Sequence, residues 1–196
     1  MDTRQFFDKY VFGWMCADIE REISWAREGK SAGNVLTALG LLAYTEFMGS
    51  QLPKSRCPNG GARKQFEAFF RELGPDYAAL LDNGVNIYDV FRCGLAHEYF
   101  VKGSCTIAMM NSTPGKLEVK GPLDEAASPP RRQESVWIQK PAECGIGVAK
   151  NGGYWFIVEK YYEDFKKACE SLCTELLTMT PIPSPPIRYS SMSDSG

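Results

Sequence analysis

The residues of this chain best suited to chemistry lie in one short segment, RCGLAHEY, at positions 92–99. His97 is the single histidine among the 196 residues, and an imidazole with its ordinary pKa near 6.5 can move protons at neutral pH. Arg92 precedes it by five residues. A guanidinium binds phosphate through two parallel hydrogen bonds and offsets charge that develops at phosphorus. Together the two side chains could cleave a phosphodiester by internal attack without a metal.

The segment belongs to a predicted helix over residues 86–101. At α-helical spacing one apolar stripe faces the core, formed by Ile87, Val90, Phe91, Gly94 and Leu95. The opposite face is centred on Asp89, Cys93 and Ala96, and Arg92 and His97 flank it. Small side chains there would let another backbone approach, which predicts a homodimer that pools these residues across a twofold axis. Glu98 falls on the core stripe, so either the helix loosens there or the carboxylate has a partner.

The pattern Arg92-x4-His97-x-Tyr99 resembles the R-x4–6-H signature of HEPN-domain proteins, many of which are RNases. The resemblance implies an up-and-down helical bundle, mostly dimeric, with both signature residues at the dimer cleft. It further implies metal-independent endoribonuclease activity on RNA, with His97 as general acid or base at the ribose 2′-hydroxyl or the leaving oxygen and Arg92 on the phosphate. Cys93 stands where active members often have Asn or Asp.

The resemblance also carries expectations about partners and supporting residues. In toxin members of the family a partner nucleotidyltransferase, acting as antitoxin, modifies the tyrosine of the motif, and here that residue would be Tyr99. Asp89 and Cys93, on one ridge with His97, are the other supporting candidates. The biological settings implied are defence, stress response and toxin–antitoxin systems.

Three other interpretations stay open. The first is a catalytically inactive HEPN-like module that binds nucleotide or protein, for which Cys93 would mark lost activity. The second is a helical interaction protein whose β-insert is the working surface. In the third, His97 is an ordinary surface histidine and Arg92 pairs with Asp89 three residues earlier, as is common on helices.

Composition narrows the ligands, metal sites and cellular locations that are possible for this protein. With 22 basic and 24 acidic residues the net charge is −2, so a phosphate ligand needs a local cation cluster. The seven cysteines include no CxxC pair, which predicts no metal site and reduced thiols, and no cofactor motif is present. No stretch reaches the length of a membrane-spanning helix and no secretory signal is visible, so we expect a cytoplasmic protein.

The elements that must position the motif are mainly helices. Apolar spacing predicts a helix over residues 3–29 capped by Thr3, with Trp14 and Trp25 among its core positions. A second helix over 31–49 is apolar nearly all round and is expected at the centre of a bundle. Further helices are predicted over residues 62–73, 75–81, 86–101 and 161–178.

Short β-branched and aromatic segments predict a small antiparallel β-insert at about 104–158, just before the last helix. Its strands are expected in CTIAMM, ESVWIQK, GIGVAK and YWFIVEK, with a hairpin turn at 150–153 and a polar loop over 111–135. The prediction is therefore a mostly α, HEPN-like single domain over residues 1–180, followed by a disordered tail over 181–196 that is rich in proline and serine.

Overall fold

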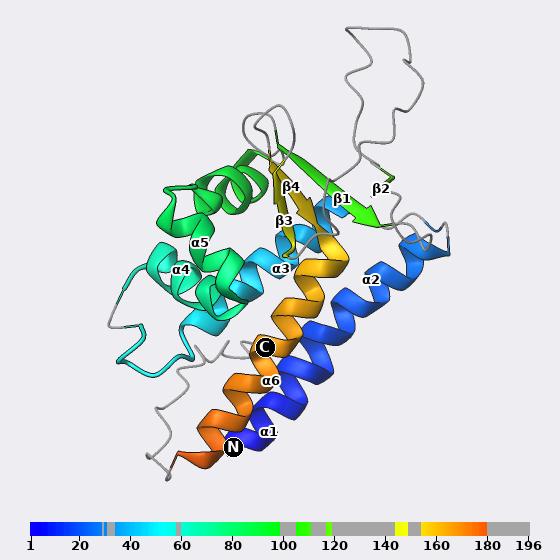
Figure 1. The fold of residues 1–196 in the computed structure, drawn as a ribbon. Helices are drawn as coiled ribbons and strands as arrows, with labels where there is room; N and C mark the ends of the chain where they lie inside the picture. Colours follow the sequence, from blue (N-terminus) through cyan, green and yellow to red (C-terminus); the bar gives the residue numbers. More distant parts are fainter. Residues whose placement is uncertain are drawn as a thin grey trace, which may run out of the picture.

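A computed structural model describes residues 1–28, 30, 34–57, 60–98, 105–110, 117–118, 144–148 and 154–179. These residues form a mostly helical fold with one small sheet, as the sequence predicts (Figure 1). The predicted strand in ESVWIQK, the hairpin turn at 150–153, Tyr99 and the tail over 181–196 lie outside the described residues.

The N-terminal helix is continuous from residue 3 to residue 27 but changes its winding. It comprises α1 (Thr3–Phe6), the π-helix η1 (Phe7–Cys16) and α2 (Ala17–Arg27). Asp2, rather than Thr3, is the cap: its Oδ1 accepts from the Gln5 N–H at 2.8 Å, and its own N–H donates to the Gln5 side chain. The core prediction for Trp14 and Trp25 is wrong, because they are 56% and 40% exposed.

Helix α3 (Asn34–Gly49) is central, as its apolar sequence predicts. It packs against α2, α4 (Ala62–Glu72), the last helix, the motif helix and strand β1. Gly49 permits the closest crossing, since a Cβ at this position would lie 1.8 Å from the Gln65 carbonyl oxygen. Helix α5 (Pro75–Asp82) starts with Pro75 in its first turn, where the missing N–H costs no hydrogen bond.

The sheet is mixed, which corrects the antiparallel prediction. Its strand order is β2-β1-β4-β3, from β1 (Thr106–Met110), β2 (Leu117–Glu118), β3 (Ile146–Val148) and β4 (Tyr154–Ile157). β3 and β4 pair antiparallel as a hairpin would, but β1 runs parallel to β4, with Ile107 opposite Phe156. The parallel pair arises because β1 and β4 are joined by a long connection rather than by a hairpin. β2 lies inside the segment that the sequence predicts as loop.

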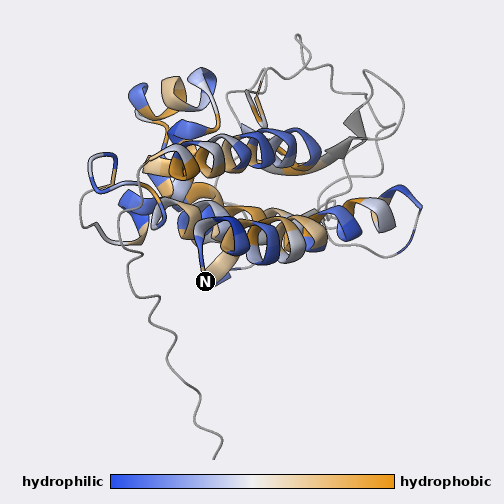
Figure 2. Cartoon of the chain, turned by 90° about the horizontal axis from the view of Figure 1, so that it is seen from below, coloured by the Kyte–Doolittle hydropathy of each residue, from blue (hydrophilic) through white to orange (hydrophobic). Residues whose placement is uncertain are grey.

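Helix α6 (Val158–Thr178) follows β4 directly and begins three residues earlier than predicted. It runs antiparallel to the α1–α2 helix along its side, while α4 and α5 lie on the other side of the molecule (Figure 1). Hydrophilic residues colour the outer sides of the helices and apolar residues their facing sides (Figure 2). The fully buried aromatic side chains of this shared core are Phe7, Phe66, Phe69, Phe70, Tyr77, Phe91, Phe156, Tyr161 and Phe165.

Candidate functional site

The motif helix is a π-helix, η2, over Tyr88–Glu98. In an α-helix residues five apart point about 140° from each other, which is why Arg92 and His97 were expected on opposite flanks. A π-helix instead closes each turn with a hydrogen bond between residues i and i+5. The winding therefore places Arg92 and His97 on the same side of η2, about one turn apart.

The apolar side of η2 fixes it to the core. Phe91 and Leu95 are buried, as are Gly94 and, just before the helix, Ile87, so four of the five predicted core positions are confirmed. Val90 is only partly buried against the same cluster. The Phe91 ring packs on Phe156 of strand β4, with ring centroids 5.8 Å apart. The small sheet thus packs against the buried side of the motif helix.

Arg92 is held by a residue that the sequence analysis missed. Its Nε donates to Oε2 of Glu46, on α3, at 2.7 Å. The two side chains are 21% and 20% exposed, so the pair is largely shielded from water. The Arg92 guanidinium also lies 5.8 Å from the centroid of the Tyr88 ring. The only signal in the sequence is the largely apolar segment of α3 around Glu46, in which a carboxylate needs a partner.

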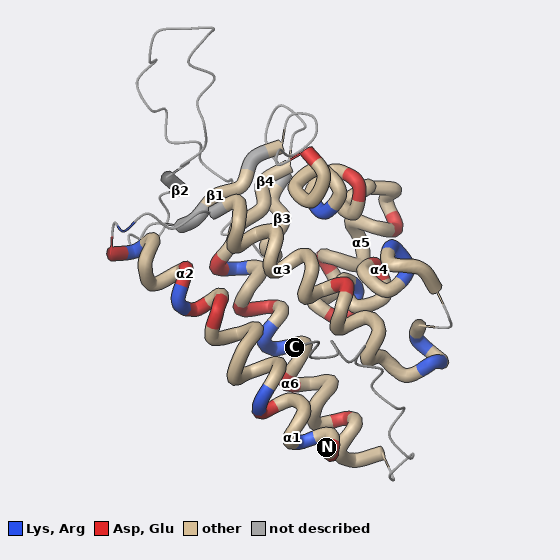
Figure 3. Tube along the Cα trace, turned by 180° about the vertical axis from the view of Figure 1, so that it is seen from behind, with Lys and Arg blue, Asp and Glu red and all other residues tan. Residues whose placement is uncertain are grey.

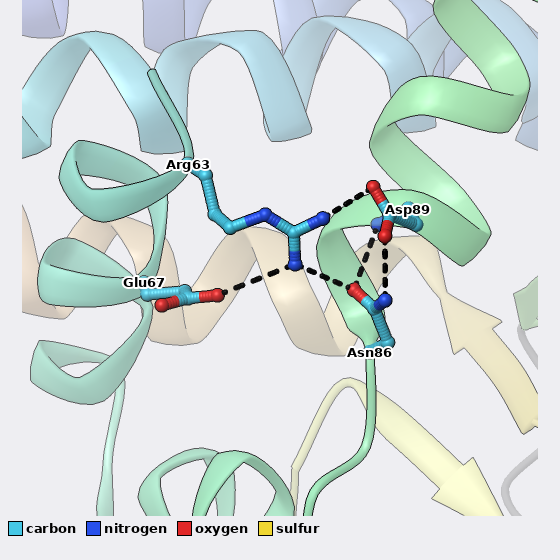
Figure 4. Close-up of polar contacts among 4 residues, drawn as sticks. All are labelled: Arg63, Glu67, Asn86 and Asp89. Carbon is cyan, nitrogen blue, oxygen red and sulfur yellow. Dashed lines mark hydrogen bonds and ion pairs between the residues drawn. The ribbon is translucent and has the colours of Figure 1, made fainter. Parts of the chain in front are cut away.

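Asp89 does not pair with Arg92, so the Arg92–Asp89 pair of the third interpretation is wrong. Its carboxylate instead accepts from Nη2 of Arg63, on α4, and from the Asn86 side-chain amide, both at 2.5 Å (Figure 4). The Arg63 hydrogen bond, followed by that of Asn86, lowers the pKa of Asp89 below its ordinary value. The Asn86 Oδ1 accepts from the Asp89 N–H at 3.2 Å and caps the start of the motif helix.

The end of η2 is open to solvent. Ala96, His97 and Glu98 are exposed, and Cys93 is half-buried. Glu98 is therefore off the core stripe, because the π winding rotates it outward. Tyr99, the third residue of the motif, lies outside the described residues. The structure thus brings Arg92, Cys93 and His97 together on one helix, with Asp89 turned toward α4.

Elsewhere, the basic residues around α4 are largely neutralised. Arg56 pairs with Glu72 at 3.0 Å and with Glu175 at 2.5 Å, and Arg71 pairs with Asp82 at 2.8 Å. Basic and acidic residues are interspersed along the described helices (Figure 3). Within the described ranges, no His, Cys, Asp and Glu side chains cluster in a way that could hold a metal ion. None of the helices described is long and apolar enough to cross a membrane.

A buried polar cluster at the base of the sheet was not foreseen. The Tyr77 hydroxyl, on α5, donates to Asp164 Oδ2 at 2.7 Å and accepts from the Gly145 N–H at 2.6 Å. Lys160 donates to the other Asp164 oxygen at 2.5 Å. The i,i+4 spacing of Lys160 and Asp164 was the only signal in the sequence, and it suggests a surface pair rather than a buried one.

No protein-family model matches this sequence, and no curated protein or solved structure is significantly similar to it.

Proposed function

We propose that this chain is a HEPN-like, metal-independent endoribonuclease that acts as a cytoplasmic homodimer. The observation that carries the proposal is the exposed His97 one π-helical turn beyond Arg92, at the solvent-facing end of η2. A proton-transfer group must be reached by substrate, and an arginine held in place by a carboxylate can meet a phosphate with little loss of conformational entropy.

In the proposed reaction the ribose 2′-oxygen attacks phosphorus. The P–O2′ bond forms as the P–O5′ bond breaks, which leaves a 2′,3′-cyclic phosphate and a 5′-hydroxyl. One proton leaves the 2′-hydroxyl and one reaches the departing 5′-oxygen. His97 of one subunit can perform one of these transfers, and the same residue of a second copy would supply the other.

Arg92 would hold the phosphate in this scheme. Its contact with Glu46 uses the Nε–H, while a guanidinium carries five N–H donors in a planar fork. Tyr99 and Cys93 would line the same cleft, and an antitoxin of the nucleotidyltransferase class would act on Tyr99. Asp89 has a different part, because its carboxylate is bound to α4.

The test is cleavage of single-stranded RNA by the purified protein in EDTA. We expect His97→Ala and Arg92→Ala each to lower the rate about 100-fold or more, within the range for loss of a general acid–base or of phosphate stabilisation. Arg71→Ala is the matched control, since Arg71 is also ion-paired but lies on α4. Cleavage that persists in His97→Ala with unchanged circular dichroism would contradict the proposal.

One observation favours the second candidate, a non-catalytic module that binds nucleotide. Glu46 already neutralises Arg92 and competes with a phosphate for it. On this alternative the parent protein cleaves no RNA, and Glu46→Gln strengthens nucleotide binding by releasing the guanidinium. For the nuclease, Glu46→Gln should instead lower the cleavage rate because Arg92 loses its fixed orientation.

A further inference from the structure

A row of aromatic side chains crosses from the N-terminal helix to α3 on the outside of the molecule. It consists of Phe6, Tyr10, Trp14 and Phe47, hereafter the aromatic row. Neighbouring ring centroids lie 6.3 Å apart for Phe47 and Phe6, 5.9 Å for Phe6 and Tyr10, and 4.6 Å for Tyr10 and Trp14. Trp14 is 56% exposed and Phe47 39% exposed. Phe6 and Tyr10 are half-buried. Contiguous aromatic rings that reach the surface of a folded domain are typical of a binding surface.

The chain leaves its last helix at the end of the molecule where the aromatic row begins. The last turns of α6 lie against α1, and the Arg4 charge acts on the Cys173 thiol. The N-terminus and the end of α6 are at the same end of the molecule (Figure 1). Leu177 and Met179 are 46% and 42% exposed, so the end of α6 presents apolar side chains to solvent. Residues 181–196 begin two residues beyond Met179.

The first residues of that tail have the chemistry that aromatic surfaces bind. Residues 181–187 read PIPSPPI, with four prolines and the spacing Pro183-x-x-Pro186. Such segments favour the polyproline II helix, and they dock on aromatic-lined surfaces at low entropic cost. From Phe6 to Trp14 the helix rises by less than the α-helical value of about 12 Å, because residues 7–16 have π winding. Four residues of polyproline II, at about 3.1 Å each, are therefore long enough to follow the row.

Charge favours this occupant over a nucleic acid. The cation beside the rings is Lys9, with Nζ 5.2 Å from the Tyr10 centroid and 5.6 Å from that of Trp14. Arg4, one turn away, is paired with Asp8 at 3.0 Å. Single-stranded RNA needs several concentrated cations as well as stacking rings, whereas a proline-rich segment needs the rings alone.

We propose that residues 181–187 of the same chain bind along the aromatic row in a polyproline II conformation. This inference does not rest on the proposed nuclease function. The tail reaches the row from its own anchor on α6, so binding is intramolecular and takes advantage of a high effective concentration.

Trypsin provides the test, because Arg188 is the single Lys or Arg after Lys167. Cleavage after Arg188 in the native full chain releases residues 189–196, whose mass identifies them. Binding of 181–187 protects this bond, and the cleavage rate follows the unbound fraction when opening is fast. We expect Trp14→Ser to raise the rate about threefold or more. The matched control is Trp25→Ser, on the same helix but outside the row, which should leave the rate unchanged.

The tail side is tested by Pro183→Ser combined with Pro186→Ser, which should raise the rate as Trp14→Ser does. Free peptides of residues 181–196 are cleaved in parallel, one with the parent sequence and one with both proline substitutions. Their rates show how much the substitutions alone change cleavage after Arg188. Equal rates for Trp14→Ser and Trp25→Ser would overturn the proposal, as would a parent rate equal to that of the free peptide. Protection that is lost on dilution would assign the row to the tail of a second copy. If Trp14→Ser weakens binding of an RNA oligomer and leaves the Arg188 rate unchanged, the row is an RNA surface.

Discussion

The polar contacts around Tyr77 and those around Arg63 use similar groups in different surroundings. Each joins a carboxylate, a cation and a neutral donor, and each connects more than one element of the fold. Tyr77 is 1% exposed and Asp164 7% exposed, whereas the Arg63 and Asp89 side chains are 44% and 41% exposed. Water can replace a lost partner in the second cluster but not in the first.

The difference indicates that the buried contacts stabilise the fold, whereas the exposed contacts position the motif helix. The buried cluster ties α5, α6 and the strand that follows Gly145 into one body. The exposed cluster sets the start of the motif helix against α4, where the contacts can change without unfolding the core (Figure 4). Arg92 and Glu46, about one-fifth exposed each, lie between these extremes.

Tyr77→Phe should have the largest effect. The substitution keeps the ring contacts with Phe70 and Tyr161 but removes a bond to a carboxylate and leaves the buried Gly145 N–H without its acceptor. Loss of a buried hydrogen bond to a charged group costs about 2 to 3 kcal/mol. Urea unfolding measures the change. Tyr88→Phe is the matched control, because the contacts of Tyr88 with Phe66, Arg63 and Arg92 are made by its ring.

The buried tyrosines also predict a loss of stability in alkali. Burial, with Asp164 adding to it, raises the pKa of Tyr77 far above its ordinary value of 10. Burial likewise raises the pKa of Tyr161, against a smaller opposing effect of the Thr45 hydrogen bond. A raised folded-state pKa gives stability that is complete below pH 10 and is lost as pH rises further. The urea midpoint should therefore fall above pH 10 and fall less steeply in Tyr77→Phe. A midpoint independent of pH between 9 and about 11 would contradict this.

Local sequence patterns were sufficient for the helices and for the core side of the motif. Asn86 and Pro75 begin their helices for reasons visible in the sequence, and Phe91 and Leu95 follow the apolar period into the core. Whether neighbouring strands pair parallel or antiparallel could not be predicted from local sequence patterns. β1 meets β4 through contacts far apart in the chain, and the β-branched runs that predict strands are the same for parallel and antiparallel neighbours.

The sequence proposes the residues of the candidate site but does not predict how they are arranged. A helical wheel assumes the α period, and η2 departs from it, which moves His97 toward Arg92 and Glu98 into solvent. The partner of Arg92 is 46 residues earlier, on a helix whose apolar sequence predicts only core packing. Spacing rules report neighbours within one helix and carry no information about Glu46.

Asn86→Ala tests whether the exposed cluster contributes through its helix cap. The Asn86 Oδ1 accepts from the Asp89 N–H and from Arg63 Nη1 at 2.9 Å. Loss of an N-cap side chain costs about 1 kcal/mol, less than the Tyr77 substitution. The free energy of unfolding is the measurement, with Asn83→Ala as the control, because Asn83 is exposed and follows α5. If Asn86→Ala and Asn83→Ala lower the free energy of unfolding equally, the helix cap does not account for the effect of Asn86→Ala.

Arg63→Ala should have the smallest effect, although Arg63 makes more contacts than any other side chain in its cluster. It is 2.5 Å from Asp89 and 3.7 Å from Glu67, and it lies 5.0 Å over the Tyr88 ring. Exposed pairs of this kind contribute about 0.5 kcal/mol, and salt screens them. Parent and variant should therefore differ slightly in dilute buffer and converge in about 1 M salt. A loss of about 2 kcal/mol that persists in salt would place this cluster with Tyr77, and the motif helix would then be as rigidly anchored as the core.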